Sequence, residues 1–320
     1  MNFWEKLTKP ILVLAPMADV TDAAFRIIIA KYGKPDVMWT EFVSADGLML
    51  ASENGKRKLL KDLSYTEGER PIVAQFFSGR PEMMEGAAKL ARELGFDGID
   101  INMGCPDKSI EKQGAGAAHM KDIKLAREVI RAAKKGAGDL PVSIKTRIGY
   151  NKDELAKWLP ELLAEKPALI TIHARTRKEM SLVPARWGHV AEAVQIRNAL
   201  GSKTLIFGNG DVKNLAEARI KAQETGADGV MLGRAIFGNP WLFSDKIPTT
   251  KEKLEILIEH SNLFEKLLGD IKNFSVMKKH FKAYITGFDG ASELRSKLMQ
   301  TNGAKEVEVA IIEYLNNNIQ

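Results

Sequence analysis

The only cysteine of the 320-residue chain, Cys105, stands where an apolar run ends and a turn begins. Gly104 before it and Pro106 after it hold the backbone in a turn and leave little bulk around the sulfur. A thiol at such a strand-to-loop switch is well placed to react with a bound ligand. A structural cysteine is more often a small hydrophobe buried within a strand or helix. This motif alone leaves both interpretations open.

Other polar residues occur at the ends of further apolar runs. Lys145 comes from a run that should be buried, and a buried ammonium group is costly to desolvate unless an anionic group meets it. Two glycine-rich stretches, Gly208–Asp211 and Gly233–Arg234, lead into helices and suit a phosphate group. Together these residues indicate a phosphate-bearing planar cofactor. Lys145 would lie beside a carbonyl that gains negative charge on reduction, as a flavin requires.

Each of these residues also has an ordinary structural interpretation. Lys145 could form an ion pair with Asp100, and His173 could be a hydrogen-bonded core histidine. The sequence Asn209-Gly210-Asp211 is a common turn. Their shared position at the same end of successive strands favours a functional interpretation of the whole set.

Eight short apolar runs, each followed by a longer amphipathic stretch, should position these residues. Several are rich in β-branched residues and almost continuously apolar, as in parallel strands buried on both faces. The expected strands are 11–15, 37–41, 72–76, 98–102, 142–147, 169–173, 204–208 and 229–232, and expected helices between them include 83–94, 123–133, 154–163, 190–199 and 215–225. Eight strand–helix units match an α/β fold of the TIM (β/α)8 barrel type. A doubly wound sheet would require a GxGxxG turn after the first strand, where this chain has Ala15-Pro16-Met17-Ala18-Asp19.

The strand pattern stops after Trp241, and the remaining chain has the pattern of helices at 251–268, 275–285, 292–299 and 307–315. We therefore expect a TIM barrel followed by a smaller, all-helical C-terminal domain, with the boundary between residues 243 and 250. Cations gather in this tail, at Lys272, Lys278, Lys279, Lys282, Arg295 and Lys297.

The composition is that of an ordinary globular protein with a small excess of positive charge. Lys and Arg number 47 and Asp and Glu 41, which gives a net charge of +6. This excess fits an acidic or phosphate-bearing partner, and equally a solvated surface. No apolar run approaches the roughly 20 residues that span a bilayer. The N-terminus lacks a secretory signal, and one cysteine cannot form an internal disulfide, so we expect a cytoplasmic protein without membrane or metal partners.

The motifs resemble those of the tRNA-dihydrouridine synthases over nearly the whole chain. The matching stretches are Ala15-Pro16-Met17, Thr21–Arg26, Asn102–Pro106, Gly114–Gly116, Lys145-Thr146-Arg147, His173–Arg177, Gly208–Val212, Gly233–Ala235 and Met277–Phe281. The cysteine motif together with Lys145 and His173 is the most specific part of this resemblance.

The resemblance implies an FMN enzyme that reduces the C5–C6 double bond of particular uridines in tRNA. The flavin N5 would pass a hydride to C6, Cys105 would protonate C5 from the opposite face, and NADPH would re-reduce the flavin. No nicotinamide motif is visible, so NADH is the alternative reductant. A thiol away from strong positive charge stays protonated at neutral pH, which suits a general acid.

The resemblance also implies two groups of binding residues. The flavin would be bound by the backbone of Pro16, Met17 and Ala18, by Gln75 at the ring, by Lys145 near N1 and O2 with His173 beside it, and by Asn209, Gly210, Asp211, Gly233 and Arg234 at the ribityl chain and phosphate. Asn102 would position the target base, Arg175 and Arg177 would face the RNA, and Lys278, Lys279, His280 and Arg295 would bind tRNA. Residues 1–243 would form the FMN-binding catalytic barrel and residues 250–320 a helical tRNA-binding domain of a monomeric enzyme.

The chain departs from the family pattern in residues 180–187. Arg186 stands at the usual aspartate position and a tyrosine is missing, which leaves open the contacts of this loop with base or nicotinamide. His119 could be a second acid–base residue or a helix-entry histidine bonded to the backbone. The basic cluster at residues 56–61 could contact tRNA or form a solvated helix face.

Two other functions compete with this interpretation. One is an FMN-dependent dehydrogenase or reductase of free pyrimidines, against which the basic helical tail argues. The other is a catalytically silent tRNA-binding or folding protein. The joint presence of Cys105, Lys145 and His173 argues against that alternative.

Overall fold

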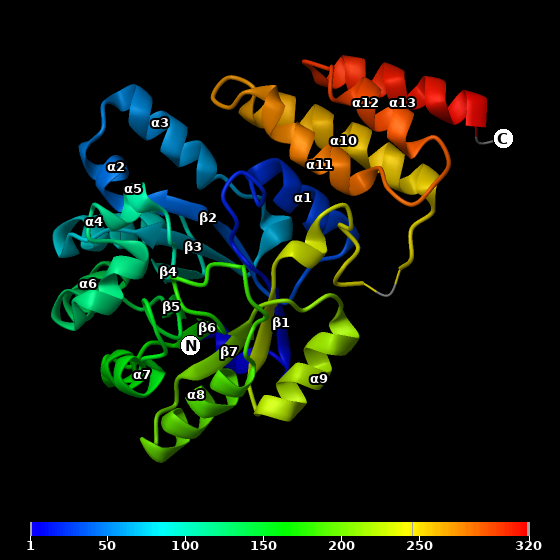
Figure 1. Cartoon of the computed structure of the whole chain (residues 1–320). Helices are drawn as coiled ribbons and strands as arrows, with labels where there is room; N and C mark the ends of the chain where they lie inside the picture. The colour runs from blue at the N-terminus through cyan, green and yellow to red at the C-terminus, as the bar shows by residue number, and fades with distance from the viewer. Residues whose placement is uncertain (1, 245, 319–320) are drawn as a thin grey trace.

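The computed structural model describes residues 2–244 and 246–318 and contains eight parallel strands curled into a barrel (Figure 1). The strands are β1 (Ile11–Leu14), β2 (Met38–Ser44), β3 (Ile72–Phe77), β4 (Gly98–Met103), β5 (Val142–Arg147), β6 (Leu169–His173), β7 (Leu205–Asn209) and β8 (Gly229–Leu232). The expected TIM-barrel architecture is confirmed, and every expected strand is present with ends shifted by at most three residues.

The barrel has one seam that is joined differently from the rest. The hydrogen-bonded order is β1-β8-β7-β6-β5-β4-β3-β2, so β1 and β2 stand at its two ends. Between them, the Asp36 N–H donates to the Leu12 carbonyl at 3.0 Å, and the Asp36 carboxylate accepts from the Leu12 N–H at 2.7 Å. Asp36, just before β2, therefore links these two edges with both its backbone and its side chain. Because all strands are parallel, their C-terminal ends gather at one end of the barrel.

Alternate strand residues fill the interior of the barrel. Ile11 and Val13 pack with Trp39 and Phe207 in one buried cluster, while the intervening residues of β1 pack outward beneath the helices. Trp4, in the 3-10 turn η1 (Phe3–Lys6), covers this cluster with its ring 5.8 Å from that of Trp39. Side chains thus fill the half of the barrel near the N-terminal ends of the strands, and a site has to lie toward the other end.

Helices surround the sheet, as Figure 1 shows. They are α1 (Ala23–Tyr32), α2 (Ala45–Leu50), α3 (Glu53–Asp62), α4 (Pro81–Glu93), α5 (Lys108–Glu111), α6 (Ile123–Ala137), α7 (Leu155–Ala164), α8 (Gly188–Ala199) and α9 (Leu215–Thr225). Asp22, Asp122 and Asn214 accept backbone N–H groups at the starts of α1, α6 and α9, which fixes where these helices begin. The expected barrel helices are confirmed as α4, α6, α7, α8 and α9.

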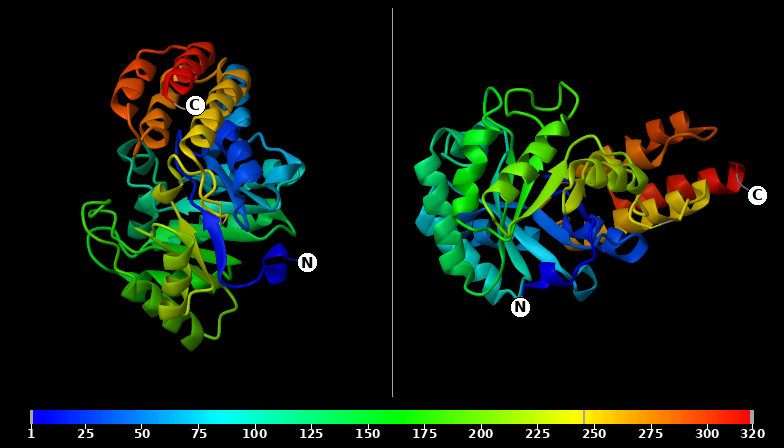
Figure 2. Two further views of the ribbon diagram at one scale, coloured as in Figure 1. Left: turned by 90° about the vertical axis from the view of Figure 1, so that its right-hand side faces the viewer. Right: turned by 90° about the horizontal axis from the view of Figure 1, so that it is seen from below.

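A layer of further helices lies to one side of the barrel, as both views of Figure 2 show. It consists of α10 (Thr250–Leu268), α11 (Lys278–Tyr284), α12 (Ala291–Leu298) and α13 (Ala304–Asn318). Thr249 and Glu252 form a capping box that starts α10. The helix expected at 275–285 is divided into the 3-10 turn η5 (Phe274–Met277) and α11.

This layer packs on α1 of the barrel. The ring of Phe25 stacks on His260 of α10 at 4.9 Å, and the Tyr32 hydroxyl donates to Glu259 at 2.5 Å. Lys31 forms an ion pair with the same carboxylate at 2.7 Å. Of the helices in the described part of the chain, none has the length and apolarity to cross a membrane.

Candidate active site

A cavity of about 680 Å³ opens at the C-terminal ends of β1 and β5–β8. Its lining comes from five different strand ends or the loops that follow them, so the residues are brought together only by the barrel. Among the predicted cofactor residues, it includes Pro16, Met17, Lys145, His173, Asn209, Gly210, Asp211, Gly233 and Arg234. Ala18 and Gln75, also predicted to contact the cofactor, are absent from the lining formed by the described residues.

Lys145 places a cation at the wall of this cavity. Its Nζ donates to Asn209 Oδ1 at 3.2 Å, and Asn209 Nδ2 donates to the Met231 carbonyl at 2.7 Å. Within residues 2–244 and 246–318, no carboxylate oxygen lies within 4.0 Å of Lys145 Nζ, so the alternative ion pair with Asp100 is not formed. Burial, reinforced by Arg147, lowers the pKa of Lys145 to about 8. The cavity therefore presents a strong hydrogen-bond donor that favours negative charge.

Asp100 instead anchors a chain of hydrogen bonds inside the barrel. Its carboxylate accepts from the Ser143 hydroxyl and from Gln75 Nε2, each at 2.5 Å, and burial raises its pKa to about 6. Gln75 Oε1 accepts from Asn102 Nδ2 at 3.2 Å. Gln75 is fully buried, and both ends of its amide are engaged by neighbours on β4.

This series of hydrogen bonds ends at the turn that carries Cys105. Asn102 Oδ1 accepts from the backbone N–H groups of Gly104 at 3.1 Å and Cys105 at 2.9 Å. Asn102 also lies opposite Lys145 in the β4–β5 ladder, so the cysteine turn follows the strand next to the one that carries Lys145. Cys105 itself is absent from the cavity lining formed by the described residues. Asn102 was expected to position a substrate base. In this structure its contacts position Cys105.

Cys105 is half-buried against Phe77, Ile110 and Ala115. Its carbonyl accepts from the Ala117 N–H at 2.9 Å, and Gly116 has a φ of +60° and leaves no room for a Cβ beside that carbonyl. Burial raises the pKa of the Cys105 thiol above its ordinary value. The sulfur therefore carries its proton at neutral pH, as a proton donor must.

His173 and Arg175 form the wall near β7. Arg175 Nη1 lies 3.1 Å from His173 Nε2, and Arg175 Nη2 donates to Asp211 at 2.5 Å. Burial and neighbouring cations hold the pKa of His173 well below its usual range, so the ring is neutral and its Nε2 accepts from the guanidinium. Arg234 donates to the other oxygen of Asp211 at 2.6 Å.

These contacts correct the expectation that Arg175 faces RNA. Arg175 is only 3% exposed and is held by a carboxylate and a ring, so it belongs to the cavity wall. Arg177 is likewise engaged, because it donates to both oxygens of Glu111 at 2.7 and 2.6 Å. Glu111 ends α5, which begins three residues after Cys105, and it also accepts from the Tyr150 hydroxyl at 3.1 Å. Arg177 therefore holds the end of α5, close in sequence to Cys105, in place.

Arg147 is a site residue for which the sequence suggested no specific role. Its Nε donates to the Gly104 carbonyl at 2.8 Å, and its Nη1 donates to the carbonyls of Thr176 and Met180 at 3.1 Å each. It thus ties the cysteine turn to the loop after β6. Its spacing of two residues from Lys145 on one strand was the available signal, since such residues share a face.

The predicted tail residues occupy different environments. Lys278 and Lys279 lie at the start of α11 and form no ion pair with any described residue, so both are available to an anionic partner. Arg295 donates to the Ile285 carbonyl at 2.8 Å and is half-buried. His280 is fully buried, with its ring 4.8 Å from Phe25 and surrounded by aromatic neighbours. The expectation that His280 contacts tRNA directly is therefore corrected: its side chain packs the helical layer onto α1.

The two unusual features of the sequence also have defined partners. Arg186 pairs with Glu179 at 2.5 Å within the loop after β6, and Trp187 donates to the Gly210 carbonyl at 2.9 Å. His119 is fully buried and its Nδ1 lies 3.1 Å from the Gly116 carbonyl, which agrees with a histidine bonded to the backbone. In the basic cluster of α3, Lys61 pairs with Asp270 at 2.5 Å and Arg57 approaches it at 3.9 Å.

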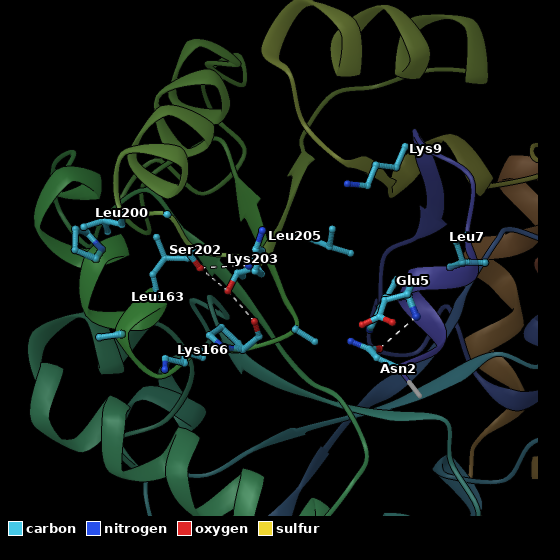
Figure 3. Close-up of a pocket in the computed structure, with 17 residues that line it drawn as sticks. Asn2, Glu5, Leu7, Lys9, Leu163, Lys166, Leu200, Ser202, Lys203 and Leu205 are labelled. Atoms are coloured by element: carbon cyan, nitrogen blue, oxygen red, sulfur yellow. Dashed lines mark hydrogen bonds between the residues drawn. The ribbon is translucent and has the colours of Figure 1, made fainter.

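A second cavity of about 910 Å³ lies at the opposite end of the barrel (Figure 3). Its lining residues precede β1, β6 and β7, which places it at the N-terminal ends of the strands. Lys9, Lys166 and Lys203 border it, and apolar side chains such as Leu163 and Leu205 form much of the rest. Chemistry in this fold takes place at the other end, so we assign this cavity no part in the site.

In the described part of the chain, one surface group has the spacing of metal ligands. It comprises Asp153, His189 and Glu192, whose donor atoms lie within 4.8 Å of one another. His189 Nδ1 is 3.1 Å from Glu192 and 3.4 Å from Asp153, as in an ordinary ion-paired surface cluster. None of these residues lines the cavity formed by Lys145 and its neighbours.

Comparisons of the sequence with family models and with known proteins identify the relatives of this chain. A family model described as "Dihydrouridine synthase (Dus)" matches residues 13–320. The chain is 39% identical over 318 residues to a "Probable tRNA-dihydrouridine synthase" of Staphylococcus aureus (strain COL), covering 98% of this chain and 95% of that protein. It is also 39% identical over 317 residues to "Probable tRNA-dihydrouridine synthase 2" of Bacillus subtilis (strain 168), covering 98% and 96%.

Solved structures share the barrel at much lower identity. A 2-naphthoyl-CoA reductase complex superposes with a TM-score of 0.57 at 14% identity, covering 75% of this chain and 52% of that protein. Histamine dehydrogenase from Rhizobium sp. 4-9 superposes with a TM-score of 0.51 at 14% identity, covering 79% and 48%. The chain spans about half the length of these two proteins, and the likeness concerns the fold.

Proposed function

Because this chain belongs to the dihydrouridine synthase family, we propose that it reduces the C5–C6 double bond of specific uridines in tRNA to 5,6-dihydrouridine. The observation that carries the proposal is that a cation at the cavity wall and a protonated thiol lie at the ends of the neighbouring strands β5 and β4. Lys145 faces the cavity, and Asn102, opposite it in the ladder, holds the turn of Cys105.

The residues of the cavity fit flavin mononucleotide. Lys145 and neutral His173 would lie at the N1 and O2 side of the ring, where an ammonium group favours the reduced, negatively charged form. The backbone around Gly210 and Gly233, with Arg234, would hold the ribityl chain and phosphate. The bound flavin would supply hydride from N5 to C6 of uracil, and NADPH would restore it. Pro16 and Met17 would support the ring from β1.

Cys105 would give its proton to C5 of the uracil. Burial keeps the thiol protonated, and the hydrogen bond from its N–H to Asn102 fixes the turn that carries it. Hydrogen bonds from Asn102 to Gln75 and from Gln75 to Asp100 anchor this turn to the barrel core. The chain thus orients the acid with interior hydrogen bonds.

Residues 1–243 would serve as the catalytic barrel and residues 250–320 as the tRNA-binding domain of a monomeric cytoplasmic enzyme. A uridine stacked in folded tRNA has to be extruded before it can reach a cavity, and contacts elsewhere must offset the unstacking cost. Lys278 and Lys279, which have no acidic partner among the described residues, are the best candidates for contacts with RNA phosphates, and Arg295 lies further along the same layer.

Mass spectrometry of nucleosides tests this function directly. Unmodified tRNA would be incubated with the protein, FMN and NADPH, using wild type and Cys105→Ala in parallel. Wild type should add two hydrogens to uridine, and the variant should be slower by about 100-fold or more, the usual contribution of a general acid. The Asp153→Asn variant, altered away from the cavity, serves as the control.

Other results would support the alternatives. Reduction of free uracil with untouched tRNA would favour a pyrimidine reductase. Equal rates for wild type and Cys105→Ala would remove the thiol from the reaction. A protein that binds tRNA but neither binds FMN nor changes uridine would be a silent binding protein.

A further inference from the structure

A single cation of the helical layer is surrounded by carboxylates of the barrel. Lys272, in the connection between α10 and η5, has its Nζ 2.8 Å from Glu41, 3.0 Å from Asp62 and 3.7 Å from Asp19. The Lys272 side chain is 14% exposed and that of Glu41 is 6% exposed. The three acidic partners come from three barrel segments: the loop after β1, β2 itself and α3. This contact therefore joins the helical layer to the barrel by charge, in addition to the pairs Lys31–Glu259 and Lys61–Asp270.

The same contact reaches the loop that lines the cavity. The Glu41 carboxylate also accepts a hydrogen bond from the backbone N–H of Asp19, whose φ of +53° marks a tight, left-handed turn. Two residues earlier, Met17 lines the cavity, and its N–H donates to the Thr21 hydroxyl at 3.0 Å. Glu41 thus holds the β1–α1 loop with one oxygen and Lys272 with the other.

Without Lys272 this cluster would hold only acids. Asp22 lies nearby at the start of α1, fully buried, with one carboxylate oxygen lacking any hydrogen-bond partner among the described residues. Burial is the main cause that raises the pKa of Glu41 to about 7, and Asp22 and Asp62 add to it while Lys272 opposes it. Removing one member of a partly buried charge network leaves the others uncompensated, so the Glu41 contacts would rearrange.

We propose that Lys272 is a positioning residue of the cofactor site, through which the helical layer holds the β1–α1 loop in the shape that lines the cavity. The inference rests on the proposed function, since it takes flavin mononucleotide as the ligand of that cavity. It follows that cofactor affinity depends on the docking of a helical region that contributes none of the described residues lining the cavity. A tRNA that shifts the helical layer would act on the flavin loop by the same route.

The experiment measures the FMN dissociation constant of the full-length protein by fluorescence titration after removal of bound flavin. Lys272→Met should weaken FMN binding at least tenfold. Lys266→Met, a matched loss of charge at an exposed position of α10, should change it less than twofold. Lys272→Arg should stay near the wild type because it restores the charge. Adding Glu41→Gln to Lys272→Met should recover part of the affinity, since glutamine keeps an oxygen for the Asp19 N–H without the unpaired charge.

The midpoint of thermal unfolding without FMN, measured on the same samples, separates positioning from stability. A lowered midpoint with an unchanged dissociation constant would overturn the proposal, as would equal affinities of Lys272→Met and Lys266→Met. If Lys272→Met does not fold, the double variant and Lys272→Arg are compared with wild type instead. In that case, an FMN dissociation constant of the Glu41→Gln/Lys272→Met variant equal to that of the wild type counts against the proposal. A wild type that binds no FMN would refute the proposed function itself, which is a different result.

Discussion

Replacing Lys145 with methionine should make the cofactor-free protein more stable at pH 7. Lys145 is half-buried at the cavity wall, and its ammonium group donates to the neutral amide of Asn209 at 3.2 Å. Burial, with a smaller contribution from Arg147, lowers the pKa of Lys145 from the ordinary 10.5 to about 8. One pKa unit corresponds to about 1.4 kcal/mol, so the charged side chain costs the fold at most about 3.5 kcal/mol. Methionine has a similar length and no charge, so it should recover much of this free energy.

The pH dependence of this gain has a definite sign. Between about pH 8 and 10.5 the unfolded chain holds the Lys145 proton more tightly than the folded protein does. The free energy of unfolding of the wild type should therefore rise with pH through that window, relative to the variant. Below pH 8 the cost is fully present, and the advantage of Lys145→Met is largest there. Near pH 10.5 the advantage should vanish.

Urea unfolding of both proteins without cofactor, followed by tryptophan fluorescence at several pH values, measures this difference. Lys266→Met controls for the loss of an exposed charge. Addition of FMN should raise the midpoint of the wild type and leave that of Lys145→Met nearly unchanged, because ligand binding stabilises only a protein that binds it. A variant less stable than wild type at pH 7, or a gain that does not shrink with rising pH, would refute the account of Lys145 as a cation without a compensating carboxylate.

Three further variants test contacts around the site. Asn102→Ala removes the acceptor of two backbone N–H groups, each worth about 1 kcal/mol, and should slow single-turnover uridine reduction about 30-fold with FMN affinity unchanged; a normal rate would contradict its positioning role. Arg177→Met releases Glu111 and should lower that rate about tenfold by loosening the cysteine loop. Weaker tRNA binding at a normal rate would instead restore the expected RNA contact of Arg177. Lys279→Ala should reduce the slope of log Kd for tRNA against log salt by roughly 0.7–0.9 in filter-binding assays, and an unchanged slope would place the phosphate contact elsewhere.

Much of the fold could be predicted because its signals are local. The β-branched strands and the amphipathic helices each show their period within a dozen residues, and the strand ends of a parallel barrel necessarily meet. That is why Lys145, His173 and Asn209 were expected together and line one cavity. Site residues whose position follows directly from a strand end were therefore the most predictable.

The partners of charged side chains were not predictable in this way. In the sequence Lys272 is one of several cations gathered in the C-terminal region. In the structure it pairs with Glu41, 231 residues away. Arg177 pairs with Glu111 across 66 residues, and no local pattern announces either contact. His280 is different, since Met277, Phe281 and Tyr284 have the spacing of one helix face and place the histidine at its buried edge. These apolar neighbours indicated that His280 is buried, but the adjacent Lys278 and Lys279 made the segment resemble a basic surface.

The packing of α10 on α1 has a consequence for synthesis of the protein. Tyr32 and its partner Glu259 are 227 residues apart, so at roughly 5–20 residues per second the ribosome needs on the order of ten to fifty seconds between them. Throughout that interval Phe25, which is fully covered in the finished molecule, has neither His260 nor His280 to cover it. The nascent barrel thus carries an exposed apolar helix near its N-terminus until almost the whole chain has been made.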